Sequence, residues 1–457
     1  MRHPHPPLLA VAFLLAGCAT PPPEPLRTPE PPAGASAHPA VAERPLPRDW
    51  WTAFRDPELD RLIGLARTQN RDLAQASARI DAARARARIA GADEKLHVSG
   101  AGGASRQRTS ENTVDQLGHN TATRFEGTLE FAYEVDLWGR LRSARLAAAK
   151  EVELAAAERA ALEISLCAQV ARHHLTRLAA RREAAVVTQQ IARYADSEAL
   201  HAARVEAGFA TDLDVQRDRI EKANLEGELA RLDQTDADQA AALALLCGQA
   251  PTNAPGSLDA PQAVLPEVPD RLSLELLEAR PDVAAQKNKW EAACLRVQTA
   301  RAEFYPAVRL IGTLGTAAER PEDLFDWQSR LWSLVGNLTA PLLDGGRLKG
   351  NLELANAQLR EAASGYEAAV LTAYREVADA MSALRAASRQ KASADAARGA
   401  AARAVALARE RYDKGFATYL EVIDGERSLL DAQRTLVQVE RERQIATVDL
   451  IRALGLP

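Results

Sequence analysis

Two stretches of the chain decide its fold: RVEAGFATDLDV at residues 204–215 and RYDKGFATYLEV at residues 411–422. They share the run Gly-Phe-Ala-Thr, and their glycines are 415 − 208 = 207 residues apart. The same shift places GRL at residues 139–141 on GRL at residues 346–348 without a gap. Agreement over so long a span predicts that the chain consists of two duplicated halves.

Each half predicts the same order of elements. A helix comes first, at residues 56–92 and 273–303. An alternating segment follows, and then an Ala/Leu/Glu/Arg run that ends at Gly208 or Gly415, before a last helix. Each long run would stretch on the order of 100 Å as a continuous helix. A helix of that length needs partners along its whole length, so coiled-coil packing is expected.

Four segments alternate between apolar and polar side chains and predict strands. In RFEGTLEFAY (residues 124–133) the apolar side chains at 125, 129, 131 and 133 share one face. Residues 332–339 and 308–314 repeat the pattern, and residues 97–107 show it most weakly. Apolar outside and polar inside is typical of a transmembrane β-barrel. For any single strand taken alone, an edge hairpin on a soluble domain is the better-supported interpretation.

The number of strands constrains the assembly. Two strands per half give four per chain, whereas about eight is the smallest barrel that closes. Four strands alone would leave unpaired edges in lipid, where backbone groups have no other partner. If these strands enter a membrane, several chains must share one barrel.

Composition excludes several classes of protein. The 457 residues carry 57 Lys+Arg and 62 Asp+Glu, a net charge of −5, so no basic excess indicates a nucleic-acid partner. Aromatic residues make up only 5%, which favours long helices packed through small side chains. Four widely spaced cysteines form neither a disulfide framework nor a zinc site. Three of them, Cys167, Cys247 and Cys294, are expected to be buried and unpaired.

The N-terminus predicts export from the cytoplasm. Residues 1–17 have a basic start and a short apolar stretch, as in a signal peptide. The run LAGC at residues 15–18 resembles a lipoprotein box, so Cys18 is expected to carry N-acyl and S-diacylglycerol lipid; a plain signal peptide with an incidental cysteine is the alternative. The Pro-rich residues 18–48 predict a tether.

On this duplicated frame the chain resembles the TolC/OprM-type outer-membrane efflux channels, in the NodT-like lipoprotein branch. The resemblance rests on segments at residues 51–63, 133–140, 276–283, 300–306, 341–346 and 411–430. It implies a mainly α-helical protein with a membrane β part. Three chains would form a long α-helical barrel topped by a shared twelve-stranded transmembrane β-barrel. Residues 49–250 and 271–457 would be the two efflux repeats, joined by a linker at 251–270.

The resemblance also implies a function. The protein would be the exit duct of a tripartite efflux system and pass small molecules such as drugs, toxic compounds or metal ions. Its partners would be a periplasmic adaptor (membrane fusion protein), an inner-membrane pump of RND type and outer-membrane lipid. Protein secretion through the same duct, or a non-channel periplasmic scaffold, remain alternatives. We expect no catalysis, no metal and no cofactor besides the lipid, and His173-His174 to lie on a partly exposed helix face.

The repeat tips carry the candidate site residues. The predicted hairpin turns are at Gly208, Thr211, Gly415 and Thr418, since glycine relieves a turn between unbroken helices.

Glu421 and Asp424 lie three apart on one helix face, and by resemblance they form acidic rings at the channel entrance. The family's gate link, a tyrosine on the second hairpin and an acid on the first, matches Tyr412 and Asp214. Ala417 stands where the family often has a basic residue, which leaves a second link open. The solvated face of a coiled coil is the alternative for these acids.

Overall fold

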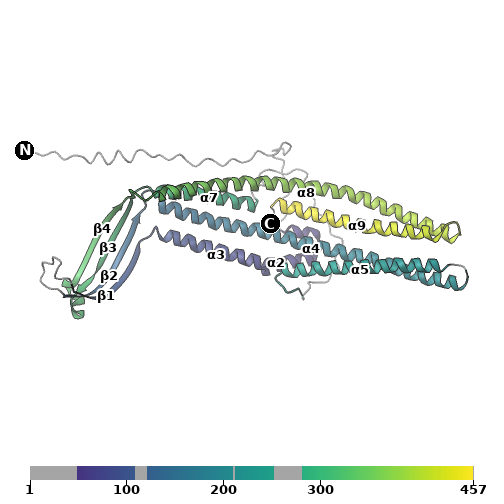
Figure 1. The fold of residues 1–457 in the computed structure, drawn as a ribbon, viewed down its shortest axis with the longest axis horizontal. Coiled ribbons are helices and arrows are strands. Elements are labelled where there is room, and N and C mark those ends of the chain that lie inside the picture. Colours follow the sequence, from purple (N-terminus) through teal and green to yellow (C-terminus); the bar gives the residue numbers. More distant parts are fainter. Residues whose placement is uncertain (1–48, 109–120, 209–210, 252–279, 456–457) are drawn as a thin grey trace, which may run out of the picture.

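The computed structural model describes residues 49–108, 121–208, 211–251 and 280–455. These ranges form an elongated molecule with a sheet at one end and helices running to the other (Figure 1). The elements are η1 (Trp50–Phe54), α2 (Pro57–Gln69), α3 (Arg71–Ala92), β1 (His97–Arg108), β2 (Thr121–Val135), α4 (Arg140–Glu206), α5 (Asp212–Leu246), α7 (Pro281–Ala302), β3 (Ala307–Ala318), η2 (Pro321–Phe325), η3 (Trp327–Ser329), β4 (Arg330–Thr339), α8 (Arg347–Asp413) and α9 (Tyr419–Ala453). The predicted signal peptide, Cys18 and tether lie outside the described residues, as do residues 252–270 of the predicted linker.

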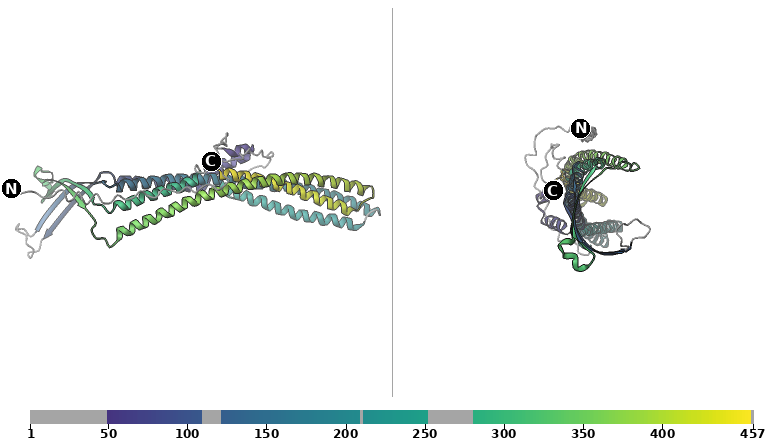
Figure 2. Two further views of the ribbon diagram at one scale, coloured as in Figure 1. Left: turned by 90° about the horizontal axis from the view of Figure 1, so that it is seen from above. Right: turned by 90° about the vertical axis from the view of Figure 1, so that its left-hand side faces the viewer.

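The two halves contain helices of equal length. Both α4 and α8 have 67 residues, and both α5 and α9 have 35. At about 1.5 Å per residue the long helices reach about 100 Å, as predicted. The pairs α4–α5 and α8–α9 run to the end of the molecule opposite the sheet, and α7 packs against both α4 and α8 (Figure 2). No helix in the described ranges combines the length and the apolarity needed to cross a bilayer.

The single helix predicted over residues 56–92 is wrong, because the chain breaks at Asn70. Asn70 has an extended backbone, and its side-chain oxygen accepts hydrogen bonds from the amides of Asp72 and Leu73 at 2.9 and 3.0 Å. Its side-chain nitrogen donates to the carbonyl of Leu246 at 2.9 Å. Asparagine is a strong helix N-cap. The residue therefore ends α2, begins α3 and ties both to the end of α5.

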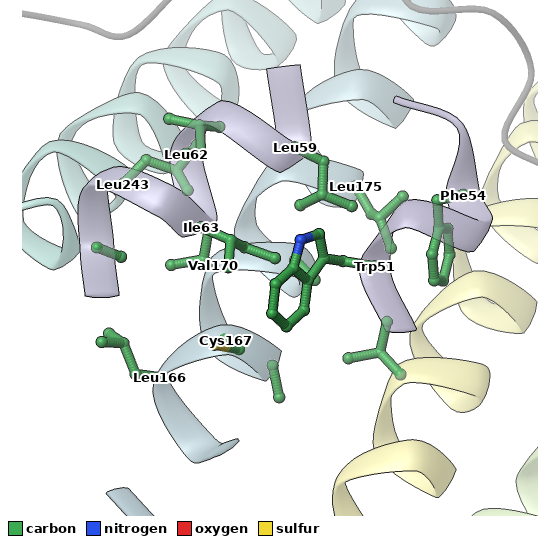
Figure 3. Packing of buried hydrophobic residues seen from close by; sticks show 14 of the residues in the cluster. Trp51, Phe54, Leu59, Leu62, Ile63, Leu166, Cys167, Val170, Leu175 and Leu243 are labelled. Atoms are coloured by element: carbon green, nitrogen blue, oxygen red, sulfur yellow. The ribbon is translucent and has the colours of Figure 1, made fainter. Parts of the chain in front are cut away.

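An aromatic core fastens the start of the described chain to the middle of the helices (Figure 3). Trp50 and Phe54 are each only 1% exposed, and Leu59, Leu62 and Ile63 are fully buried. They pack against α4, α5 and α9. Burying side chains of this size stabilises by about 1.5–3 kcal/mol each, before the entropy of ordering them.

The three cysteines in the described ranges are buried and free, as predicted. Burial raises the pKa of Cys167 to about 12 and that of Cys294 to about 11. A thiol with so high a pKa is almost never a thiolate near neutral pH, so neither side chain is a reactive nucleophile.

The sheet has the strand order β1-β2-β3-β4, and every neighbouring pair is antiparallel. All four predicted strands are present, each slightly longer than expected. Residues that pair across neighbouring strands have their side chains on the same face of the sheet. The register therefore puts apolar side chains of all four strands on one face. That face includes the partners Val98–Phe131, Leu129–Leu314, Leu314–Trp332 and Val308–Leu338. Trp332 is 80% exposed, and Leu334, on the same face, is 73% exposed. Within the chain, β1 and β4 each have a partner strand on one side only.

Candidate functional site

The free ends of the two hairpins hold the candidate site. Gly208 and Gly415 have φ angles of +78° and +76°, the left-handed region that glycine adopts most readily. In the second tip, the amide of Phe416 donates to the carbonyl of Arg411 at 2.8 Å and that of Gly415 to Tyr412 at 2.9 Å. This pair of bonds is a Schellman motif, which ends α8 at the predicted turn. Residues 209–210 of the first tip lie outside the described residues.

Gly415→Ala is expected to destabilise the protein by about 1 kcal/mol, since a Cβ disfavours the left-handed backbone. Gly227 in α5 is the matched control. Its added Cβ meets no atom within 4 Å, and its backbone is helical. Gly227→Ala should therefore stabilise by about 0.5–1 kcal/mol. Chemical unfolding of both variants measures the two shifts, and equal signs would contradict the turn assignment.

The two acids of the second tip point away from the body of their own chain. Glu421 and Asp424 are exposed, whereas Val422 and Ile423 between them are buried. Thr418 and Glu421 form a capping box at the start of α9. Asp424 lies 4.0 Å from Arg427 and is 62% exposed. The pair therefore presents two carboxylates to solvent at the end of the molecule.

Tyr412 and Asp214 have different partners within the chain. The Tyr412 hydroxyl lies 3.3 Å from Arg204 Nη1 and 3.4 Å from His201 Nε2. Asp214 accepts a hydrogen bond from the Thr211 hydroxyl at 3.3 Å and pairs with a nearby arginine at 3.5 Å. The gate link between Tyr412 and Asp214 stays a prediction for the assembled protein.

A buried polar cluster that the sequence analysis missed joins the two hairpins. His201 on α4 is 1% exposed, and its Nδ1 donates to Asp218 Oδ2 on α5 at 2.7 Å. The Tyr419 hydroxyl, from α9 of the second hairpin, donates to the other oxygen of Asp218. Ser197 Oγ lies 2.8 Å from that hydroxyl, and Tyr412 contacts the outer side of His201. Burial and the bond to Asp218 raise the pKa of Tyr419, so it stays a hydrogen-bond donor.

A signal for this cluster exists in the repeat. The shift of 207 that aligns the tips places His201 on Ala408 and Asp218 on Gly425. The cluster thus occupies positions where the two halves differ.

Ion pairs extend the connection between the hairpins along α9. Three of them join an arginine on α9 to a glutamate of the first hairpin: Arg427–Glu221, Arg434–Glu183 and Arg434–Glu228. In the fourth, Arg409 and Glu426 pair within the second hairpin, and Glu426 accepts a hydrogen bond from Gln190 of the first. A single exposed ion pair contributes little to the stability of the fold, but Glu183 and Glu426 are buried. The first and second hairpins are therefore held together well beyond the tip.

The prediction for His173-His174 is wrong in part, because His174 is fully buried. Its Nε2 lies 2.7 Å from Asp56 Oδ2, and Asp56 also caps α2 by accepting from the amides of Glu58 and Leu59. Burial alone would raise the pKa of Asp56, but the bond and charge of His174 and the helix amides outweigh it and lower that pKa. Adjacency along a helix could not reveal a partner 118 residues away.

Nothing in the described ranges brings three or more His, Cys, Asp or Glu side chains together in a way that could hold a metal ion. The described residues show instead two exposed carboxylates at the second tip and a buried polar cluster that joins one hairpin to the other.

Comparison with known proteins identifies the same architecture. The family model described as outer membrane efflux protein matches residues 62–249 and 272–456. The chain is 34% identical over 458 residues to the pyoverdine export outer membrane protein OpmQ of Pseudomonas putida, covering 98% of this chain and 96% of the relative. It is 32% identical over 463 residues to the toluene efflux pump outer membrane protein TtgF of another Pseudomonas putida strain, covering 98% and 95%.

Solved structures agree with these matches. The outer membrane protein VceC of Vibrio cholerae superimposes with a TM-score of 0.84 at 30% identity, over 90% of this chain and 98% of that one. The outer-membrane channel OprN gives a TM-score of 0.85 at 27% identity, over 95% and 98%.

Proposed function

The chain belongs to the outer membrane efflux protein family, and from that membership we propose how it forms a duct. It is an outer-membrane efflux protein, and it would work with a periplasmic adaptor and an inner-membrane pump, as the name of an efflux-pump relative supports. Three chains would place their sheets edge to edge, β4 of one beside β1 of the next, as a twelve-stranded barrel. The observation that carries this proposal is a four-stranded sheet with two one-sided edges and an exposed apolar face. Only a closed barrel satisfies such edges in lipid.

The helices would continue the barrel as a long periplasmic tube that ends at the hairpin tips. Glu421 and Asp424 would form two stacked rings of three carboxylates at its mouth, and their exposure supports this role. Lipid on Cys18 would anchor each chain to the outer membrane. The pump would be of RND type.

We infer a small-molecule cargo. Relatives are named for export of pyoverdine and efflux of toluene, which are compounds rather than proteins. The family match also favours the channel over the adaptor-like scaffold that the sequence left open. No bond needs to be made or broken in this role, since the duct only provides a path.

Planar-bilayer recording of the purified protein tests the proposal. We expect a trimer that gives small, cation-selective steps, because a closed mouth lined by acids attracts cations. Tyr412→Phe with Asp214→Ala should enlarge the steps if that pair closes the mouth between subunits. A monomer without conductance would overturn the duct itself, whereas unchanged steps in the variant would overturn only this gate link.

Glu421→Gln with Asp424→Asn is expected to reduce cation selectivity severalfold, since the field of the rings is removed. Reversal potentials in a salt gradient measure the change. Glu361→Gln on α8 is the control, because Glu361 is an exposed acid that lies 3.8 Å from Lys289, far from the tips along the helix. A similar loss in both variants would remove the assignment of the acids to the mouth.

A further inference from the structure

A groove of about 680 Å³ crosses the apolar face of the sheet, from the middle of β1 and β2 to the start of β4. Leu129 and Leu314 border it on one side. One rung of paired residues runs through it: Gly102, Gly127, Thr316 and Arg330. Two members of this rung are glycines, which have no side chain. The floor of the groove is therefore backbone at these two positions. The groove is therefore apolar along most of its length and cationic at the β4 end.

Arg330 is placed to receive an anion from outside the protein. Its guanidinium lies 4.0 Å from the ring centroid of Trp327, which orients it by cation–π attraction. No carboxylate in the described ranges pairs with Arg330. On the opposite face, three residues farther out along β2 than Gly127, Arg124 is already paired with Glu126 at 2.7 Å. Arg106 on β1 shares the face of Arg330 and lies four residues farther out than Gly102, the β1 member of the same rung.

The position of Arg330 along its strand matches the edge of a membrane. Eight residues separate it from Leu338, the last apolar residue of β4 on this face. At about 3.3 Å per residue and a tilt of about 40°, these span about 20 Å along the bilayer normal. That length is comparable to the lipid-facing apolar band of about 25 Å in such barrels. Arg330 thus lies at the outer edge of the band, where lipid phosphates are found.

We propose that this groove binds a phosphorylated lipid of the outer leaflet, with one acyl chain over the glycine floor and a headgroup phosphate on Arg330. The inference rests on the proposed barrel, which turns this face toward lipid. In that barrel the β4 edge of one chain meets the β1 edge of the next, so the cationic end of the groove would lie at the boundary between two chains. Guanidinium groups bind phosphate with paired, charge-assisted hydrogen bonds.

The chemistry of the groove favours a lipid over other occupants. A free phosphate would gain nothing from the apolar floor between Leu129 and Leu314. A second copy of the chain uses the β1 and β4 edges in the proposed assembly, and those edges leave this face uncovered. An acyl chain attached to a phosphate satisfies both halves of the site.

Native mass spectrometry of the delipidated wild-type protein tests the proposal, with diphosphorylated lipid A and its dephosphorylated form as probes. The wild type should retain the diphosphorylated form about tenfold better, a preference typical of one good charge-assisted contact. Arg330→Gln should lose that preference, and Arg330→Lys should keep part of it. Arg124→Gln, on the opposite face, should bind like the wild type.

A second variant tests the floor independently of charge. A Cβ at Gly127 meets no atom within 4 Å, so Gly127→Leu should fill the groove without disturbing the strands and weaken both lipid forms several-fold. Equal retention by the wild type, Arg330→Gln and Gly127→Leu would overturn the lipid site. The trimer and its conductance are measured on the same samples. A conducting trimer without lipid preference refutes this inference alone, and a non-conducting monomer refutes the proposed duct.

Discussion

Asp218→Ala is expected to loosen the contact between the two hairpins near the tips and to enlarge the conductance steps of the channel. Asp218 is fully buried and accepts hydrogen bonds from both His201 and Tyr419. Its removal leaves the buried His201 ring without its carboxylate. Breaking a buried pair in this way lowers the free energy of unfolding by about 3–5 kcal/mol. The lost bond from Tyr419 adds less, because the Tyr419 hydroxyl keeps its contact with Ser197.

Asp238→Ala on the same helix is the matched control for that experiment. Asp238 is exposed and accepts a hydrogen bond from Gln234, so its loss should cost less than about 0.5 kcal/mol. Single-channel recording and chemical unfolding are measured for both variants. If the two behave alike, the cluster does not hold the hairpins together.

Asp56→Ala is expected to be the most destabilising change away from the tips, by about 3–5 kcal/mol. It removes the N-cap of α2 and leaves His174 buried without its partner. Asp56→Asn keeps an acceptor oxygen for the cap and should cost less. Asp81→Ala, whose ion pair with Arg84 is exposed, is the control and should be nearly neutral. Thermal unfolding in detergent measures the stability of the three variants. A loss of stability in Asp81→Ala as large as that in Asp56→Ala would contradict the role of Asp56.

The effect of Asp56 should depend on pH in a defined direction. Its pKa in the folded protein is lowered from the ordinary value of 3.8. A carboxyl of this kind stabilises the fold fully above its unfolded pKa, and the contribution is lost as pH falls through the folded pKa. The part of the stability difference between wild type and Asp56→Ala that comes from the Asp56 charge should therefore shrink as the pH falls below about 4.

The long helices were predictable because their signals are local. A glycine that ends a helix in the left-handed region is visible in the sequence, and the repeat shows it twice, at Gly208 and Gly415. The sheet was predictable because alternation of side chains has a period of two. Asn70 was missed because helical periodicity continues across it, although the residue type is a known cap.

The buried polar groups were missed for a different reason. His174 meets Asp56 across 118 residues, and Tyr419 meets Asp218 across 201. Such pairs depend on how helices pack, and no local pattern encodes that. Glu421 and Asp424 were singled out by the resemblance to efflux channels rather than by their contacts, and their role at the channel entrance stays a prediction.

The equal lengths of the two hairpins have a consequence for stoichiometry. In the proposed trimer, six tips of the same length would meet in one ring. Every tip would carry the same four residues, Gly-Phe-Ala-Thr. A binding protein that contacts only this common sequence would have six nearly equivalent binding sites. One that contacts positions where the two tips differ, such as Glu421 in one and Asp214 in the other, would have three. If three chains assemble as proposed, the common tip sequence would therefore offer an adaptor twice as many binding positions as the differing residues do.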